Sequence, residues 1–138
     1  MILFSALLLL GAAQSTADAD YKATCNQAEA DKGIQGEMNI CAHADYLAAD
    51  REMNAQWQKT AAQMKQADKT SVPSDGLPGY FEALLAGQRA WLTFRDAHCV
   101  SAGYWARGGS MQPMLVSSCL EKLTEDRTQQ LRQLADHP

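Results

Sequence analysis

Apolar residues recur at intervals of three or four along two long stretches of the chain, a spacing typical of amphipathic α-helices. The first stretch runs from Gln35 to about Gln66, and the second from Tyr80 to about Arg107. Neither contains proline, and charged residues occupy many of the remaining positions. We therefore predict two long helices, each with one apolar face that packs against a neighbour.

Shorter segments complete the pattern. Residues 20–34 predict a short first helix or turn, and Asp68 to Gly79 is rich in Pro, Gly, Ser and Asp, which favours a loop. The run Gly108-Gly109-Ser110 ends the second long helix, and Ser110 suits the N-cap of a final helix. That helix is expected to bury Leu115, Cys119, Leu123, Leu131 and Leu134. We predict an all-α fold, an antiparallel bundle of three main helices plus a short N-terminal helix.

The first ten residues are almost wholly apolar, and small residues follow them. This pattern is typical of a secretory signal peptide, and the run is too short to span a bilayer core of about 30 Å. The alternative is a buried N-terminal helix. We expect a signal peptide over residues 1–19 and one exported helical domain over residues 20–138, periplasmic or secreted. No stable membrane insertion is expected after the signal is cleaved.

The chain contains four cysteines, an even number, and disulfides are the usual state of such cysteines in exported proteins. A metal site would need closely spaced Cys and His pairs, and the spacing of Cys41 and His43 does not suit zinc. Cys99 and Cys119 fall on the core faces of two helices joined by a tight turn. The predicted disulfides are therefore Cys99–Cys119 and Cys25–Cys41, with no metal.

Charge and motifs narrow the possible functions. The chain has 12 basic and 16 acidic residues, and cleavage after residue 19 would leave a net charge of −3. This balance argues against nucleic-acid binding and suits a cationic protein partner. The sequence contains no phosphate-binding loop, nucleophile elbow or zinc-hydrolase motif. We expect no enzymatic activity and no cofactor; the enzymatic alternative is a hydrolase that uses Asp50 or Glu52.

Several polar residues fall where the helical period calls for apolar ones. They are Asp50, Asn54, Gln88, Arg95 and Arg127. An isolated buried charge is costly, so we predict an Asp50–Arg95 ion pair whose hydrogen bonding the other three complete. The favoured interpretation is a buried polar network that sets helix register; the alternative is a ligand or catalytic site around Asp50. Tyr46, Trp57 and Trp91 share these faces and are predicted core aromatic residues.

The same residues resemble the motifs of a known family. One run extends from Cys41 to Asn54 and includes Asp50-Arg-Glu-Met-Asn54; the other is Gln88-Arg-Ala-Trp-Leu-Thr-Phe-Arg-Asp-Ala-His-Cys99. Both are similar to an exported family that resembles the N-terminal region of LprI-type lysozyme inhibitors. The resemblance covers roughly residues 25–134. It implies a helical, disulfide-bonded fold.

The resemblance also implies a protein partner, lysozyme, which would be inhibited by non-covalent contact. Lysozyme works through two carboxylates in a cleft. Because the motif residues are expected in the core, the binding face must lie elsewhere. The candidate is the turn at Arg107, Gly108, Gly109 and Ser110, where Arg107 would address a carboxylate. The alternative is an envelope interaction module that has another protein partner and no inhibitory activity.

Overall fold

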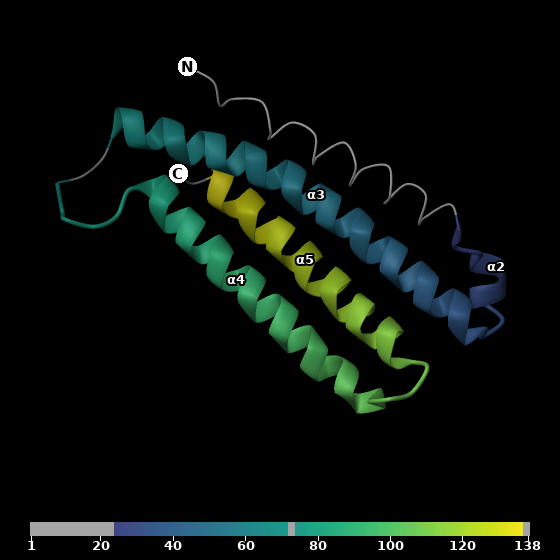
Figure 1. Ribbon diagram of the computed structural model, residues 1–138. Helices are drawn as coiled ribbons and strands as arrows, with labels where there is room; N and C mark the ends of the chain where they lie inside the picture. The colour runs from purple at the N-terminus through teal and green to yellow at the C-terminus, as the bar shows by residue number, and fades with distance from the viewer. Residues whose placement is uncertain (1–23, 72–73, 137–138) are drawn as a thin grey trace, which may run out of the picture.

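The computed structural model describes residues 24–71 and 74–136, and these form α-helices with no strand (Figure 1). The elements are α2 (Gln27–Ala30), α3 (Gln35–Thr70), α4 (Tyr80–Gly103), the short 3-10 helix η1 (Tyr104–Ala106) and α5 (Gln112–Asp136). The predicted all-α class is confirmed. The predicted signal peptide, residues 1–19, lies outside the described residues.

The three long helices lie side by side, with α5 between α3 and α4 in the view of Figure 1. Successive helices run in opposite directions, so the predicted antiparallel bundle is confirmed. Both predicted disulfides are present, Cys25–Cys41 and Cys99–Cys119, with Cα–Cα distances of 5.0 and 5.4 Å. None of the described helices combines the length and the apolar character that crossing a membrane requires.

Helix α5 packs most extensively against α3, through a seam of small side chains. Its buried residues are Ser117, Thr124, Thr128, Leu131 and Ala135. Thr60 of α3 donates a hydrogen bond from its hydroxyl to the carbonyl of Leu131 at 2.9 Å, so a polar group is satisfied inside the seam. Small residues let the two backbones approach closely, and a hydroxyl with a partner can be buried at little cost.

The expected buried face of α5 was therefore wrong in part. Leu131 is completely buried, but Leu115, Cys119 and Leu123 are only half-buried, and Leu134 is 42% exposed. The most buried line of α5 is the one that faces α3, and beside Leu131 it holds mostly serine and threonine. Apolar spacing alone does not identify that line, because all of its members except Leu131 are small or polar.

The larger apolar side chains form a core near the end of the bundle where α3 stops and α4 begins. Its members are Met53, Ala61, Met64, Leu84 and Leu131, with Trp57, Tyr80, Phe81 and Trp91 half-buried around them.

The helix ends differ from the predicted ones. Helix α3 continues to Thr70, so Asp68 belongs to its last turn and not to the loop. Its carboxylate accepts hydrogen bonds from the backbone N–H groups of Tyr80 and Phe81, at 2.7 and 3.1 Å, and so caps α4 from a neighbouring helix. Ser110 is not the N-cap of α5, which begins two residues later at Gln112.

Candidate functional site

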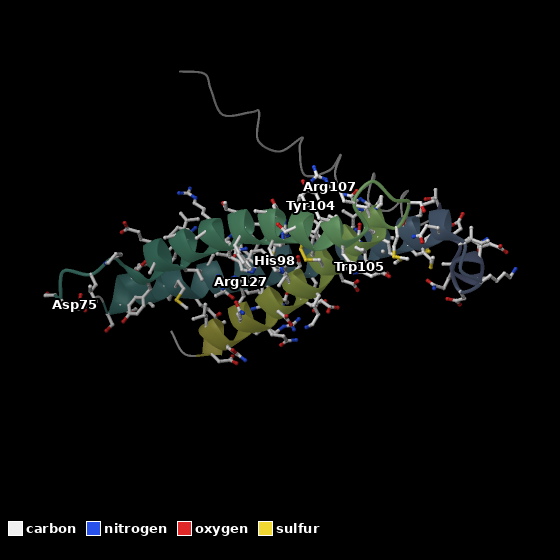
Figure 2. The ribbon with its side chains drawn as sticks, turned by 90° about the horizontal axis from the view of Figure 1, so that it is seen from below. Asp75, His98, Tyr104, Trp105, Arg107 and Arg127 are labelled. Carbon is white, nitrogen blue, oxygen red and sulfur yellow. A yellow bond between two sulfur atoms is a disulfide. The ribbon has the colours of Figure 1, made fainter. Side chains whose placement is uncertain are left out.

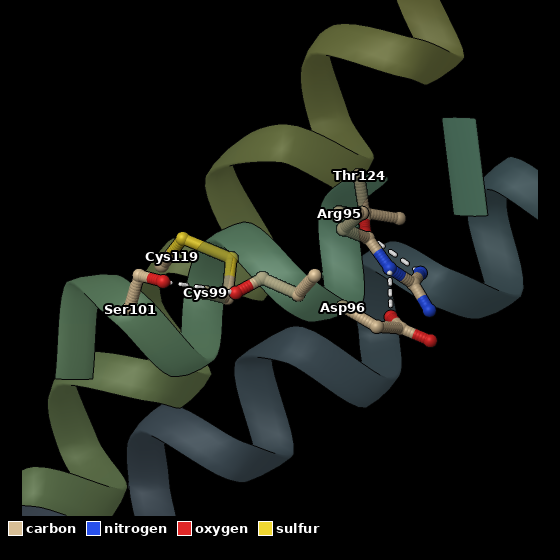
Figure 3. The surroundings of a disulfide bond; sticks show 7 residues. Arg95, Asp96, Cys99, Ser101, Cys119 and Thr124 are labelled. Carbon is tan, nitrogen blue, oxygen red and sulfur yellow. Dashed lines mark hydrogen bonds and ion pairs between the residues drawn. A yellow bond between two sulfur atoms is a disulfide. The ribbon is translucent and has the colours of Figure 1, made fainter. Parts of the chain in front are cut away.

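The centre of the polar cluster is Arg95 on α4, only 6% exposed. Its Nη1 donates to Asp50 Oδ1 at 3.1 Å and to the hydroxyl of Thr124 at 3.2 Å, and its Nε donates to Asp96 Oδ1 at 2.9 Å. Figure 3 shows Arg95 between α4 and α5, with Asp96 and Thr124 as partners. One guanidinium therefore links all three long helices.

Aromatic rings enclose the same guanidinium. Its central carbon lies 5.5 Å from the ring centroid of Tyr46 and 5.1 Å from that of Trp91, both within the range of cation–π attraction. Burial alone would lower the pKa of Arg95, but the hydrogen bond to Asp96 and the neighbouring charges outweigh it and raise that pKa. Burial, followed by the charge of Asp50, raises the pKa of Tyr46. Arg95 is thus an ionised structural centre.

Asp50 is less buried than its partner, with 30% of its side chain exposed. Its second oxygen accepts a hydrogen bond from Asn54 Nδ2 at 3.0 Å. Asp50, Asn54 and Arg95 line an open depression of about 380 Å³. Because the arginine neutralises the carboxylate and both of its oxygens accept hydrogen bonds, the arrangement suits a structural ion pair better than a general base.

The remaining two predicted polar residues form a separate pair. Arg127 Nε on α5 donates to Gln88 Oε1 on α4 at 2.9 Å, and its Nη1 donates to Gln130 Oε1 at 3.0 Å. Both arginines lie near the ring of Trp91, with their guanidinium carbons at 5.1 Å (Arg95) and 5.9 Å (Arg127) from its centroid. The five residues are therefore two arginine centres that share one tryptophan, and not one network.

Sequence reasoning missed Asp96 and Thr124 as partners of Arg95. Asp96 follows Arg95 directly and is largely exposed, so helical periodicity places it off the core face. Thr124 is completely buried, yet it is one of the small polar residues of α5 that apolar spacing passes over. Within residues 24–71 and 74–136, no group of His, Cys, Asp or Glu side chains has the arrangement of a metal site.

The predicted binding turn lies at the end of the α4–α5 hairpin. We call residues 104–110 the tip. Trp105 is 82% exposed and Tyr104 is 46% exposed, while the guanidinium carbon of Arg107 lies 4.5 Å from the centroid of the Tyr104 ring. Figure 2 shows these three side chains around the tip end of α4. Because Tyr104 and Trp105 are adjacent, they give the tip an exposed aromatic surface that a protein partner could bury.

Local contacts hold the tip in one conformation. Gly108 adopts φ 78°, a left-handed backbone, and its N–H donates to Gln112 Oε1 at 2.9 Å. Asn39 Nδ2 donates to the carbonyl of Ser110 at 2.9 Å, which ties the tip to α3. The Cys99–Cys119 disulfide joins helices α4 and α5 of this hairpin (Figure 3). The tip therefore projects from the end of the bundle, and these contacts fix its conformation.

An acidic groove lies between α3 and α5. Its cavity of about 330 Å³ is lined in part by Glu52, Glu125, Asp126 and Arg132. Glu52 is paired with Arg132, and Asp126 is paired with Lys122. Glu121 lies nearby, and burial, followed by the charges of Asp45 and Glu125, raises its pKa. The carboxylates of the lining outnumber its one arginine, so the groove is acidic on balance and suits a cationic partner.

Comparison with known proteins identifies relatives of the chain. The sequence model of the family described as "Lysozyme inhibitor LprI" matches residues 25–131, a span that includes both disulfides, both arginine centres and the tip. A protein of Rhizobium meliloti (strain 1021), described as uncharacterized, is 48% identical over 103 residues, which cover 74% of each chain. No solved structure gave a significant match.

Proposed function

Because the chain belongs to the family of LprI lysozyme inhibitors, we propose that it is an exported protein that binds lysozyme and inhibits it by non-covalent contact. The observation that carries the proposed contact surface is the tip, where Tyr104, Trp105 and Arg107 are exposed on a braced hairpin. Tryptophan, tyrosine and arginine are the residue types most enriched among the hot spots of protein interfaces.

The chemistry of the tip suits the lysozyme cleft. Lysozyme cleaves its polysaccharide with two acidic groups that flank the scissile bond. Arg107 carries a planar guanidinium, which pairs well with a carboxylate. Trp105 offers a large apolar surface to the walls of the cleft. Since the turn at Gly108 is already fixed, little conformational entropy is lost when the tip inserts.

The acidic groove supplies a second contribution. Lysozyme is cationic, and the lining of this groove, with three carboxylates against the single cation Arg132, would attract it before contact. Attraction of this kind acts mainly on the association rate and weakens as salt screens exposed charges. In this proposal the tip determines how long the complex lasts, and the acidic groove determines how fast it forms.

The proposal is tested by incubating the exported protein with lysozyme and measuring lysis of a cell-wall substrate. Lytic activity should fall at near-stoichiometric ratios. Trp105→Ala and Arg107→Glu should each weaken inhibition at least tenfold, about 1.4 kcal/mol or more of binding free energy. Both substitutions are at exposed positions, so the free energy of unfolding should change by about 0.5 kcal/mol or less.

The matched controls are on α4, away from the tip. Phe94 is 55% exposed and stacks on His98, and Arg89 is exposed near the middle of α4. Phe94→Ala and Arg89→Glu should leave inhibition unchanged. Equal losses at all four positions would contradict a contact confined to the tip. Lysis that continues undiminished with several lysozyme types would reject inhibition and favour an envelope module with another protein partner.

A further inference from the structure

An apolar pocket lies in the half of the bundle away from the tip. Its volume is about 410 Å³, within the range of small-molecule sites. Its walls include Met64 of α3, Tyr80, Leu84 and Gly87 of α4, and Arg127 and Leu134 of α5. The exposed fraction of Leu134, 42%, makes it an apolar rim residue in contact with solvent. The pocket is thus apolar apart from a tyrosine and one cationic group.

That cationic group has no counterion in the described part of the chain. Arg127 is half-buried, and its hydrogen-bond acceptors are the neutral amides of Gln88 and Gln130. Burial lowers its pKa, with no acidic neighbour to oppose the effect. A partly buried charge without an opposite charge is unfavourable, so an anion that entered the pocket would gain from Arg127. Arg95, in contrast, has two carboxylate partners.

The guanidinium is held so that one nitrogen remains for a ligand. Gln88 accepts from Nε and Gln130 accepts from Nη1, which fixes the plane of the group. Nη2 lies 4.0 Å from the position that a Cβ on Gly87 would occupy, and apart from the backbone next to Gly87 no other atom lies within 4 Å of that position. Glycine inside a helix costs about 1 kcal/mol relative to alanine. Here its missing side chain leaves the approach to Nη2 open.

We propose that this pocket binds a single-chain amphipathic carboxylate, with the carboxylate on Arg127 and the alkyl chain between Leu84 and Leu134. One guanidinium balances one negative charge and pairs with the planar carboxylate, whereas a phosphate dianion would keep an unpaired charge. Arg127 and Leu134 are seven residues apart on α5, about 10 Å along the axis, which a chain of about eight carbons would cover.

The test is calorimetric titration of the disulfide-bonded protein with decanoate, decanol and decyltrimethylammonium, each below its micelle concentration. Decanoate should bind with a stoichiometry of one and at least tenfold more tightly than the other two, because it alone offers an anion to Arg127. In NMR spectra, the Nε–H resonance of Arg127 should shift on addition of decanoate and stay unchanged with decyltrimethylammonium.

Variants separate this site from adsorption of a tail to any apolar surface. Arg127→Gln should weaken decanoate binding at least tenfold and remove its advantage over decanol, while Arg89→Gln, an exposed arginine of α4, should bind like the natural protein. Ala83 also lines the pocket and is otherwise exposed, so Ala83→Trp should block binding without touching Arg127. If Arg127→Gln does not fold, Ala83→Trp decides the question. Equal affinity for the three amphiphiles, absence of saturable binding, or decanoate binding unaffected by Ala83→Trp would overturn the proposal.

Discussion

Replacing Arg95 with alanine should lower the free energy of unfolding by about 3 kcal/mol, and replacing Asp50 with alanine should lower it by only about 1 kcal/mol. The difference follows from burial. Arg95 is 6% exposed, whereas the side chains of Asp50 and Asp96 are 30% and 64% exposed. Without the arginine, both carboxylates can be solvated by water, so neither is stranded as a buried charge.

The magnitude is the sum of contacts that the guanidinium makes. Each of its two ring contacts, with Tyr46 and Trp91, contributes about 0.5–1 kcal/mol. Thr124 is completely buried, and the loss of the partner of its hydroxyl costs about 1–3 kcal/mol. Ion pairs with partly exposed carboxylates add about 0–1 kcal/mol each. In Asp50→Ala, Arg95 still forms its ion pair with Asp96, so the free energy of unfolding falls less than in Arg95→Ala.

Urea unfolding at neutral pH, with the disulfides intact, measures both variants. Arg95→Met serves as a control, because it keeps the packing of the side-chain stem and removes the charge; its stability should lie between those of the natural protein and Arg95→Ala. Equal destabilisation by Asp50→Ala and Arg95→Ala would contradict this prediction. It would indicate a fully buried ion pair, in which removing either charge leaves the other one buried and unpaired. A stability of Arg95→Ala close to that of the natural protein would show that neither the ring contacts nor the hydrogen bond to Thr124 stabilises the fold.

Two further predictions concern the disulfides and the acidic groove. The two disulfides close loops of similar length, since their cysteines are 16 and 20 residues apart. Removing either one, in Cys25→Ser/Cys41→Ser or in Cys99→Ser/Cys119→Ser, should therefore lower the free energy of unfolding in urea by about 3 kcal/mol. Under conditions where both stay folded, only the second should also weaken inhibition in the lysis assay, because only that disulfide braces the tip. Glu121→Gln should raise the free energy of unfolding at pH 7 but not at pH 3. Burial, followed by Asp45 and Glu125, raises the pKa of Glu121 in the folded state, so the favourable contribution of its proton is present at low pH and is lost as pH rises through the folded pKa.

The long helices were predictable because their signals are local and repeated. Helix α3 extends over 36 residues without proline, and many successive turns carry the same apolar face. The disulfides were predictable for a related reason. Cys99 and Cys119 lie on helices joined by a short turn, so hairpin geometry brings them together once the two core faces are assigned.

The helix ends were not predictable, because contacts between helices set them. Asp68 resembles a loop residue in composition, but its carboxylate caps α4 across the connection. Ser110 has the chemistry of an N-cap, yet its carbonyl accepts a hydrogen bond from Asn39 and the helix starts beyond it. In each case the deciding partner is more than ten residues away in sequence.

In the candidate site, too, some features were predictable from the sequence and others were not. Periodicity selected the polar residues that face the interior, and Asp50 and Arg95 do form an ion pair. It gave no information on how these residues divide between two arginine centres, since that depends on which side chains come within hydrogen-bond distance of each guanidinium. The unpaired charge of Arg127 and the pocket beside it arise only when α3, α4 and α5 are assembled.

The close packing of α4 against α5 next to the tip can be tested at Gly103, the last residue of α4. Gly103 is buried, and a Cβ there would overlap Cγ2 of Val116 on α5. Alanine is preferred over glycine in a helix by about 1 kcal/mol, so the sign of Gly103→Ala depends on whether Val116 can move. Valine has little rotamer freedom in a helix, and overpacking costs about 1–3 kcal/mol, so we expect a net loss of about 1 kcal/mol in urea unfolding. In a Val116→Ala background the obstacle is absent, and the same substitution should become stabilising. A Gly103→Ala effect of equal sign in both backgrounds would show that the close approach of α4 and α5 does not depend on this glycine.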